Sequence, residues 1–215
     1  MIIPKISTKN KEFSLAPGVN EDHLMTTHLS VIVVGANPNL SKKWIKGEYS
    51  EDNLSPSCFS FDGKIPDESS VEPQADMCAL CPQNAWGSRT TPTGKRIKAC
   101  ADYKRLAVVL AEKPTDEVYL LQVTPTSLKN LNAYHKILQS KSISPEIAKT
   151  RVSFDTTVEF PRLVFEFAGF VDESLQDGID KLCVSEDVKI ITGELSASER
   201  QPTFSDYGFT KIDKS

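Results

Sequence analysis

Four of the chain's five cysteines lie in one stretch of about sixty residues that shows no regular hydrophobic periodicity. These are Cys58, Cys78, Cys81 and Cys100, separated by nineteen, two and eighteen residues. A C-x2-C pair presents two thiolates from one tight turn, and two more distant thiolates complete a tetrahedral S4 shell suited to zinc. Because the stretch has almost no apolar residues to bury, bound metal is its expected source of folding free energy, on the order of 10 kcal/mol or more. We therefore expect a structural Zn2+ site.

Two other states of these cysteines stay open at the level of the sequence, an iron–sulfur cluster and free or disulfide-paired thiols. The N-terminus has no positively charged region ahead of a longer apolar one, so we expect a cytoplasmic chain, in which structural disulfides are disfavoured. The fifth cysteine, Cys183, falls on the apolar stripe of a predicted helix and is expected to be a small buried hydrophobe. A closed four-cysteine shell leaves no open coordination position, which argues against catalytic zinc.

The net charge of −4, from 25 basic and 29 acidic residues, hides a strong local polarity. Residues 48–76 hold eight acidic residues and one lysine, a net charge of −7. Residues 89–105 hold six basic residues and one aspartate, a net charge of +5. The chain as a whole is therefore no polycation, and any site for a polyanion must be local.

Hydrophobic patterns outside this stretch predict a mainly β, α+β protein. β-branched and apolar segments predict five core strands, and helical spacing predicts two longer helices and two shorter ones. The strands are 28–35, 106–111, 117–124, 151–158 and 162–170; the helices are 127–141, capped by Thr126 or Ser127, 172–184, and the short segments 41–49 and 144–146. An antiparallel barrel explains this order more simply than a parallel sheet, which needs a helix between strand pairs. We expect one domain over 1–195, an inserted zinc-binding subdomain at about 50–105, and a flexible tail over 196–215.

Cations and aromatic side chains cluster next to the cysteines. A protein that binds single strands without sequence preference needs cations along a groove and aromatic faces on which bases stack. The candidates form two groups: Lys42, Lys43, Trp44 and Lys46, and then Trp86, Arg89, Lys95, Arg96, Lys98, Tyr103, Lys104 and Arg105. The alternatives are that Trp86 packs over the metal site, that Trp44 and Tyr49 belong to the core, and that the cations form an ordinary solvated face. The phenylalanines between Phe154 and Phe170 are expected to be mostly core.

The segments around the cysteines have an individual pattern. It comprises Pro56-Ser57-Cys58, Cys78-Ala79-Leu80-Cys81-Pro82, Trp86-Gly87-Ser88, Gly94-Lys95 and Ala99-Cys100, with Val31 to Ala36 upstream and Thr126 to Lys129 downstream. From about Ile2 to about Glu173 the chain resembles a family of small proteins of tailed bacteriophages and prophages. The resemblance implies a single-stranded-DNA-binding protein with an OB barrel and a zinc-binding insertion, as in the T-even phage proteins, whose ligand set differs. The strongly acidic tail of many such proteins is missing here.

Signs of catalysis are weak in this sequence. His23, His28 and His135 have no nearby serine or cysteine context that marks a nucleophile and base, and Asp62-Gly63 is typical of a turn. Phosphate-loop and deaminase signatures are absent, and no apolar run is long enough to span a membrane. We therefore expect a non-enzymatic protein that coats and protects single-stranded DNA during replication or recombination.

The expected location is the cytoplasm of an infected bacterial host, with phage replication or recombination proteins as candidate partners. One rival function is a zinc-stabilised protein that modulates transcription or docks a partner through the acidic residues 48–76. An iron–sulfur nuclease or glycosylase is a third.

Overall fold

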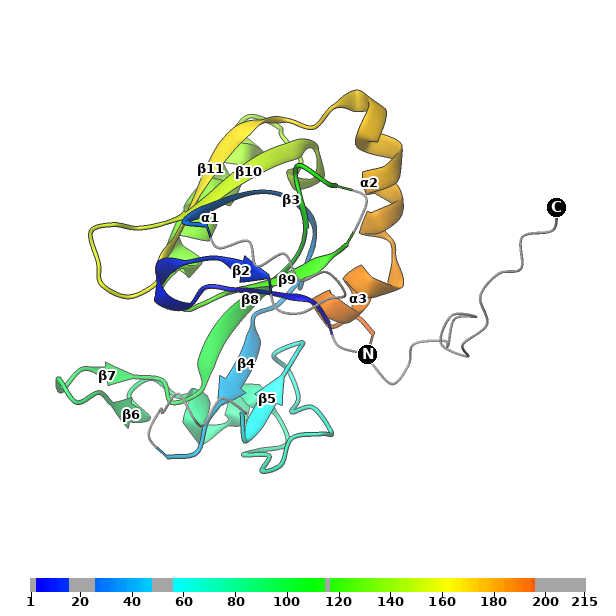
Figure 1. The fold of residues 1–215 in the computed structure, drawn as a ribbon. Coiled ribbons are helices and arrows are strands. Elements are labelled where there is room, and N and C mark those ends of the chain that lie inside the picture. The colour runs from blue at the N-terminus through cyan, green and yellow to red at the C-terminus, as the bar shows by residue number, and fades with distance from the viewer. Residues whose placement is uncertain (1–2, 16–25, 48–55, 115–116, 196–215) are drawn as a thin grey trace.

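A computed structural model describes residues 3–15, 26–47, 56–114 and 117–195, and shows a curled, open β-sheet with helices on both faces (Figure 1). The strand order is β11-β10-β3-β8-β9-β1-β2. The strands are β1 (Lys5–Ser7), β2 (Ser14–Leu15), β3 (His28–Ala36), β8 (Ala101–Leu110), β9 (Tyr119–Val123), β10 (Ala148–Phe154) and β11 (Leu163–Phe170). All neighbours are antiparallel except β1 and β9. The predicted mainly β, α+β class is confirmed, and the described strands form a half-barrel that stays open.

Phe13 links the β2 end of the sheet to strand β10 across the inside of the curl. It forms an isolated bridge with Thr26, in which each backbone N–H donates to the other residue's carbonyl at 2.7 and 3.2 Å. Its ring is fully buried and stacks on Phe154 of β10, with 4.4 Å between ring centroids. Burying a phenylalanine contributes about 1.5–3 kcal/mol, so this contact favours the curled sheet.

Each face of the sheet has its own hydrophobic core. The inner core includes Val31, Val108 and Leu121 and is covered by α1 (Leu128–Ser140), which buries Tyr134 and Leu138 in it. The outer core includes Ile32, Val109 and Leu120 and is covered by α2 (Gln176–Cys183) and α3 (Glu186–Thr192), through Ile179, Val188 and Ile191. Odd and even residues of the central strands thus enter different cores, as alternation in a two-sided sheet requires.

The helix predictions for the half-barrel need two corrections. α1 lies where its spacing predicted, but the Ser127 side chain does not cap it: its hydroxyl accepts the backbone N–H of Leu163 at 2.9 Å and ties the helix to β11. α3 was not predicted. Its start is capped by Ser185, whose hydroxyl accepts from the N–H of Val188, and it ends at Gly193 with φ of 80°. The remaining one-turn helices of the body are η1 (Lys9–Lys11), η4 (Pro145–Ile147) and η5 (Glu173–Leu175).

The predicted helix over 41–49 is wrong within the described part, because residues 41–44 form strand β4 (Ser41–Trp44). This strand pairs with β8 on one side and with β5 (Cys58–Ser60) on the other. Asn37 bridges the interval between β3 and β4: its N–H donates to the Arg105 carbonyl at 3.1 Å, and its Oδ1 accepts the Arg105 N–H at 2.8 Å. The long strand β8 therefore has β3 and β4 as successive partners. It runs from the sheet into the cysteine-containing segment.

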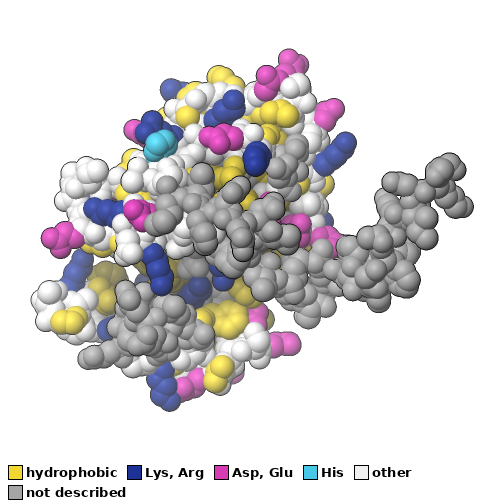
Figure 2. All heavy atoms as spheres, in the orientation of Figure 1, with side chains coloured by type: hydrophobic (Ala, Val, Ile, Leu, Met, Phe, Trp, Pro, Cys, Tyr) yellow, Lys and Arg dark blue, Asp and Glu magenta, His cyan; other side chains and the backbone are white. Residues whose placement is uncertain are grey.

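The residues between β3 and β8 lie together below the half-barrel in Figure 1. Besides β4 and β5 their elements are η2 (Cys78–Leu80), η3 (Pro82–Asn84), β6 (Arg89–Thr90) and β7 (Arg96–Ile97). β6 and β7 form a separate hairpin that projects to one side (Figure 1). Figure 2 shows the surface hollowed between this lower part and the half-barrel, with Lys and Arg side chains at the edges of the hollow. Among the described residues, no helix combines the length and hydrophobicity of a membrane span.

Candidate metal centre and nucleic-acid interface

The four predicted ligand cysteines meet in one neighbourhood. Cys58 begins β5, Cys78 begins the turn η2, Cys81 follows that turn, and Cys100 directly precedes β8. Burial raises the pKa of the Cys100 thiol to about 12; the Lys42 ammonium opposes this shift, and the thiols of Cys81, Cys78 and Cys58 add to it. Segments as far apart as β5 and β8 thus bring all four sulfur atoms within electrostatic reach of each other.

The donor set fits a metal that prefers thiolates. All five cysteines are described and free, so disulfide pairing is not seen. Three of the four clustered thiols are buried, where a free thiolate is disfavoured and a metal-bound one is not. In the part of the chain that the structure describes, no three His, Cys, Asp or Glu side chains stand in an arrangement ready to hold an ion. A closed S4 shell would require the four thiols to draw together around the metal.

A partly buried ion network borders the thiols. The carboxylate of Asp102 accepts from Lys42 Nζ and from Lys98 Nζ, both at 2.6 Å. Asn84 Oδ1 accepts from the same two ammonium groups at 3.3 and 3.1 Å, and its amide donates to the Cys78 carbonyl at 2.9 Å. Burial raises the pKa of Asp102, but the hydrogen bonds from the two lysines outweigh it and hold that pKa below its usual value. Lys42 and Lys98 are therefore engaged within the insertion, and neither projects as an unpaired cation.

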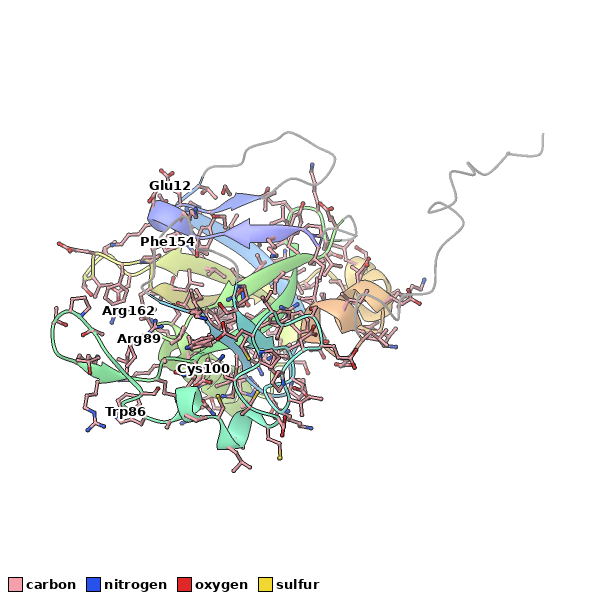
Figure 3. All side chains as sticks on the ribbon, turned by 90° about the horizontal axis from the view of Figure 1, so that it is seen from below. Glu12, Trp86, Arg89, Cys100, Phe154 and Arg162 are labelled. Atoms are coloured by element: carbon pink, nitrogen blue, oxygen red, sulfur yellow. The ribbon has the colours of Figure 1, made fainter. Side chains whose placement is uncertain are left out.

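The two tryptophans have opposite environments. Trp44 is 8% exposed and packs with Cys58, Ala99 and Cys100 in a small core of its own. The expectation that Trp44 stacks on bases is therefore wrong, because its ring covers the cysteine site. Trp86 is 70% exposed and lies at the outer edge of the insertion, whereas Cys100 lies deeper (Figure 3). Trp44, and not Trp86, therefore packs against the cysteines, and the face of Trp86 is open to a ligand.

The hairpin β6–β7 carries the accessible cations. Arg89 anchors it, since Nη2 donates to the carbonyls of Ile45 and Gly47 at 3.0 and 3.2 Å. Lys95 and Arg96 are exposed. Lys46 is exposed as well, but its ammonium pairs with Glu72 at 2.9 Å. Of the predicted DNA-binding cations, Lys95, Arg96 and the partly exposed Arg89 thus share one projecting ribbon.

Gly87, which follows Trp86 in the chain, makes room for the Arg96 guanidinium. A Cβ atom at Gly87 would lie 2.4 Å from Arg96 Nη2 and 2.6 Å from Nε, so only glycine lets the guanidinium lie against the backbone here. The residue also has a φ of +85° and donates its N–H to the Ile97 carbonyl at 3.1 Å. The exposed indole of Trp86 thus precedes the backbone position against which the guanidinium lies. An aromatic face and a cation at neighbouring places in the fold are the groups that suit a base and its phosphate.

We expect Gly87→Ala to weaken binding of a single-stranded oligonucleotide roughly threefold to tenfold, because the methyl group displaces Arg96. Gly94→Ala is the matched control: its φ is +80°, but a Cβ there has no heavy atom within 4 Å. Both variants carry the same strain of a left-handed alanine, and only the first moves Arg96. Equal effects in a fluorescence titration would mean that strain, and not the position of Arg96, controls binding.

The remaining candidate cations point inward. The Lys104 ammonium donates to the Asn37 carbonyl, and burial lowers its pKa. Arg105 is 5% exposed, its Nε donates to the Ile191 carbonyl of α3 at 2.5 Å, and its Cζ lies 4.5 Å from the centroid of the Phe61 ring. Burial lowers the pKa of Arg105 to about 10. Neither residue therefore presents its charge on an open surface of the described structure: Lys104 is tied to the segment that follows β3, and Arg105 is tied to α3.

Lys43 bridges the insertion and the sheet. Its Nζ donates to Gln122 Oε1 of β9 at 2.8 Å and lies 5.3 Å from the centroid of the Tyr103 ring. Burial, together with the positive charges of Lys5 and Arg105, lowers the pKa of Lys43 to about 8. Protonated Lys43 therefore lowers the free energy of unfolding, and this effect is complete at every pH below about 8. It decreases as the pH rises toward 10.5, the pKa of lysine in the unfolded chain, because the side chain is then neutral in both states.

We therefore expect Lys43→Met to raise the free energy of unfolding by about 1–3 kcal/mol at pH 7, with a gain that shrinks above about pH 8 and vanishes near pH 10.5. Urea denaturation at several pH values measures it. Lys136→Met on the exposed face of α1 is the control and should change stability by less than about 0.5 kcal/mol. A loss of stability in Lys43→Met at pH 7 would contradict the assignment.

Several predicted features lie outside the described residues, namely His23, Tyr49, the acidic residues 48–55 and the tail 196–215. Sequence reasoning did not single out Gln122 and Lys5. Gln122 comes near Lys43 because β8 pairs with both β4 and β9, and Lys5 because β1 pairs with β9. Gly87 was seen as part of a motif, without its role at Arg96. Comparison with known protein families, with curated proteins and with solved structures returns no match for this chain, so the resemblance to phage proteins stays a prediction.

Proposed function

We propose that this protein binds single-stranded DNA without sequence preference, using a basic ribbon next to a structural zinc site. The observation that carries the proposal is the exposed Trp86 at the base of a hairpin on which Lys95 and Arg96 are exposed, with the Arg96 guanidinium lying against Gly87. Base stacking on an aromatic face and phosphate neutralisation by nearby cations are the two contributions that nonspecific single-strand binders combine. The OB-like barrel is part of this proposal, and the curled, open sheet supports it.

Cys58, Cys78, Cys81 and Cys100 would hold the zinc. The ion would supply folding free energy to a segment whose own core is limited to Trp44, Ala99 and two of the cysteines. Four thiolates around Zn2+ leave a net charge of about −2. Burial raises the pKa of the Cys78 and Cys100 thiols, and the nearby Lys42 ammonium opposes this rise in both, so its positive charge favours the thiolate form that zinc binds. The site would thus fix the base of the ribbon and take no part in catalysis.

The test is a titration of the zinc-loaded protein with oligothymidylate and with duplex DNA of equal length. We expect preference for the single strand and a linear fall of log affinity with log salt, with a slope of about −0.7 per phosphate contact. Replacing Lys95 and Arg96 together by glutamine should reduce the slope by about 1.4. The control, Lys136→Gln with Lys141→Gln, removes two exposed cations of the α1 region and should leave the slope unchanged. Absence of binding at low salt would refute the proposal.

One observation favours a second candidate, a protein that docks a partner through the insertion. Ile65, Val71, Met77 and Leu80 are all exposed and stand among acidic residues of the segment 65–80. Exposed apolar side chains within a charged surface are typical of interaction sites. If the protein fails to bind oligothymidylate, and if charge reversal in this segment abolishes partner docking while zinc stays bound, this candidate replaces the first.

A further inference from the structure

Three cations converge where the insertion meets the half-barrel. Lys43 extends from β4, Arg105 from β8 and Lys5 from β1. Among the described residues, the charged groups that shift the pKa of Lys43 are Lys5 and Arg105, both positive, and no carboxylate of the described chain compensates them there. Like charges that approach each other without a counter-charge oppose folding, so the arrangement is incomplete without an anion.

Arg105 adds a second, independent sign of a missing partner. It is 5% exposed, and its Nε donates to Ile191. Within the described residues, neither terminal nitrogen of its guanidinium, Nη1 or Nη2, meets a hydrogen-bond acceptor. Buried guanidinium groups normally satisfy their donors, and leaving them unpaired costs free energy. Donors of this kind, next to a half-buried ammonium, are suited to an anion.

The three residues are graded in depth. Lys5 is exposed, Lys43 is half-buried and Arg105 is buried, so the positive charge runs from the surface to the interior. Gln122 stands opposite Arg105 in the β8–β9 register and uses its Oε1 to accept from Lys43, which leaves its side-chain amide N–H groups as further donors. A planar guanidinium, an ammonium and an amide are the groups that recognise the oxygens of a phosphate.

We propose that Arg105, Lys43 and Lys5 form a binding site for a phosphate group at the junction of the insertion and the sheet. The inference rests on the proposed function in one respect: the phosphate is that of the bound DNA strand, and a free phosphate ion is the alternative source. Within the described residues, the charged groups facing Lys43 are Lys5 from β1 and Arg105 from β8, alongside the neutral Gln122 of β9 and the Tyr103 ring of β8. Binding should weaken as the pH rises through about 8, where Lys43 loses its proton in the free protein.

The first arm of the experiment uses inorganic phosphate alone. The melting temperature of the zinc-loaded full chain is measured against phosphate concentration, with chloride of equal ionic strength as reference. We expect a saturable rise, and a dissociation constant roughly tenfold or more higher in the variant Lys43→Gln with Lys5→Gln. The control, Lys136→Gln with Lys141→Gln, makes the same change in net charge away from the site and should match the wild type. Equal phosphate binding by both double variants, or no saturable effect in the wild type, overturns the proposal.

The second arm identifies the source of the phosphate. If phosphate competes with oligothymidylate, and the Lys43→Gln with Lys5→Gln variant binds the oligonucleotide more weakly than the control, the site belongs to the path of the strand. If phosphate binds but the protein does not bind oligothymidylate, the proposed function fails while the phosphate site stands with a free ion as its ligand. If oligothymidylate binds equally well to both double variants and phosphate has no effect, the function stands and the site is refuted.

Discussion

Cys81→Ser is expected to abolish zinc binding, from about one ion per chain to nearly none, and to unfold the insertion. Cys81 is the half-exposed member of the thiol cluster, so serine there removes a ligand with little loss of packing. The metal contributes free energy on the order of 10 kcal/mol to structural sites, and the small core around Trp44 cannot replace it. The half-barrel should stay folded, because neither of its two cores contains a buried cysteine of the cluster.

Metal analysis and limited proteolysis measure the two effects. The control is Cys183→Ser, which makes the same chemical change at another half-buried cysteine, packed at the edge of the outer core. This control should keep its zinc and its protease resistance. Full zinc content in Cys81→Ser would refute the four-thiolate shell. If the purified protein has the brown colour of an iron–sulfur cluster, the four cysteines hold iron and not zinc.

Trp86→Ala is expected to weaken oligothymidylate binding by about 1–3 kcal/mol, a factor of roughly 5 to 150. The indole is 70% exposed, so its removal should leave the free energy of unfolding nearly unchanged. The chain has two tryptophans, and Trp44 is buried beside the cysteines. Quenching of tryptophan fluorescence by the oligonucleotide should therefore disappear in this variant, while the emission of Trp44 continues to report on the metal site.

Phe170→Ala is the matched control for Trp86→Ala. Phe170 is also exposed, but it ends strand β11 and stacks edge-on against Phe167, away from the hairpin. Its loss should not change the affinity for oligothymidylate. If the two alanine variants bind equally well, or if quenching persists without Trp86, stacking on this residue is wrong and Tyr103 becomes the next candidate.

Much of the β-sheet followed from local pattern alone. The segment 28–35 is a strand at nearly its predicted limits, and the predicted hairpin of 106–111 with 117–124 is present, although β8 already begins at Ala101. β-branched residues that alternate between two buried faces have few other ways to fold. Helix α3 was missed although its signals are present: Ser185 as cap, Val188 and Ile191 at helical spacing, and Gly193 after the last turn.

Other features had no local signal. Residues 41–44 carry lysines and a tryptophan, which suit a short helix as well as a strand. They form a strand because β8 extends beyond the sheet and offers free backbone groups on one side while β5 offers them on the other. The sequence likewise does not show which of the two tryptophans is buried, because both are the same residue type in similarly basic surroundings. Trp44 packs against Cys58 and Cys100 because β4 pairs with β5.

The sequence by itself determined the mainly β class, the position of the main helix and the set of four cysteines, because each depends on residue type at short and regular spacing. Only the tertiary structure decided which cations face solvent. Lys42, Lys104 and Arg105 bind a carboxylate, carbonyls or an aromatic ring from distant segments, and Lys98 shares the Asp102 carboxylate with Lys42, whereas Lys95 and Arg96 stay exposed on the hairpin. The physical reason is that a charge becomes structural or available according to the partners that long-range packing brings within hydrogen-bonding distance, and charge counting along the chain contains no such distances.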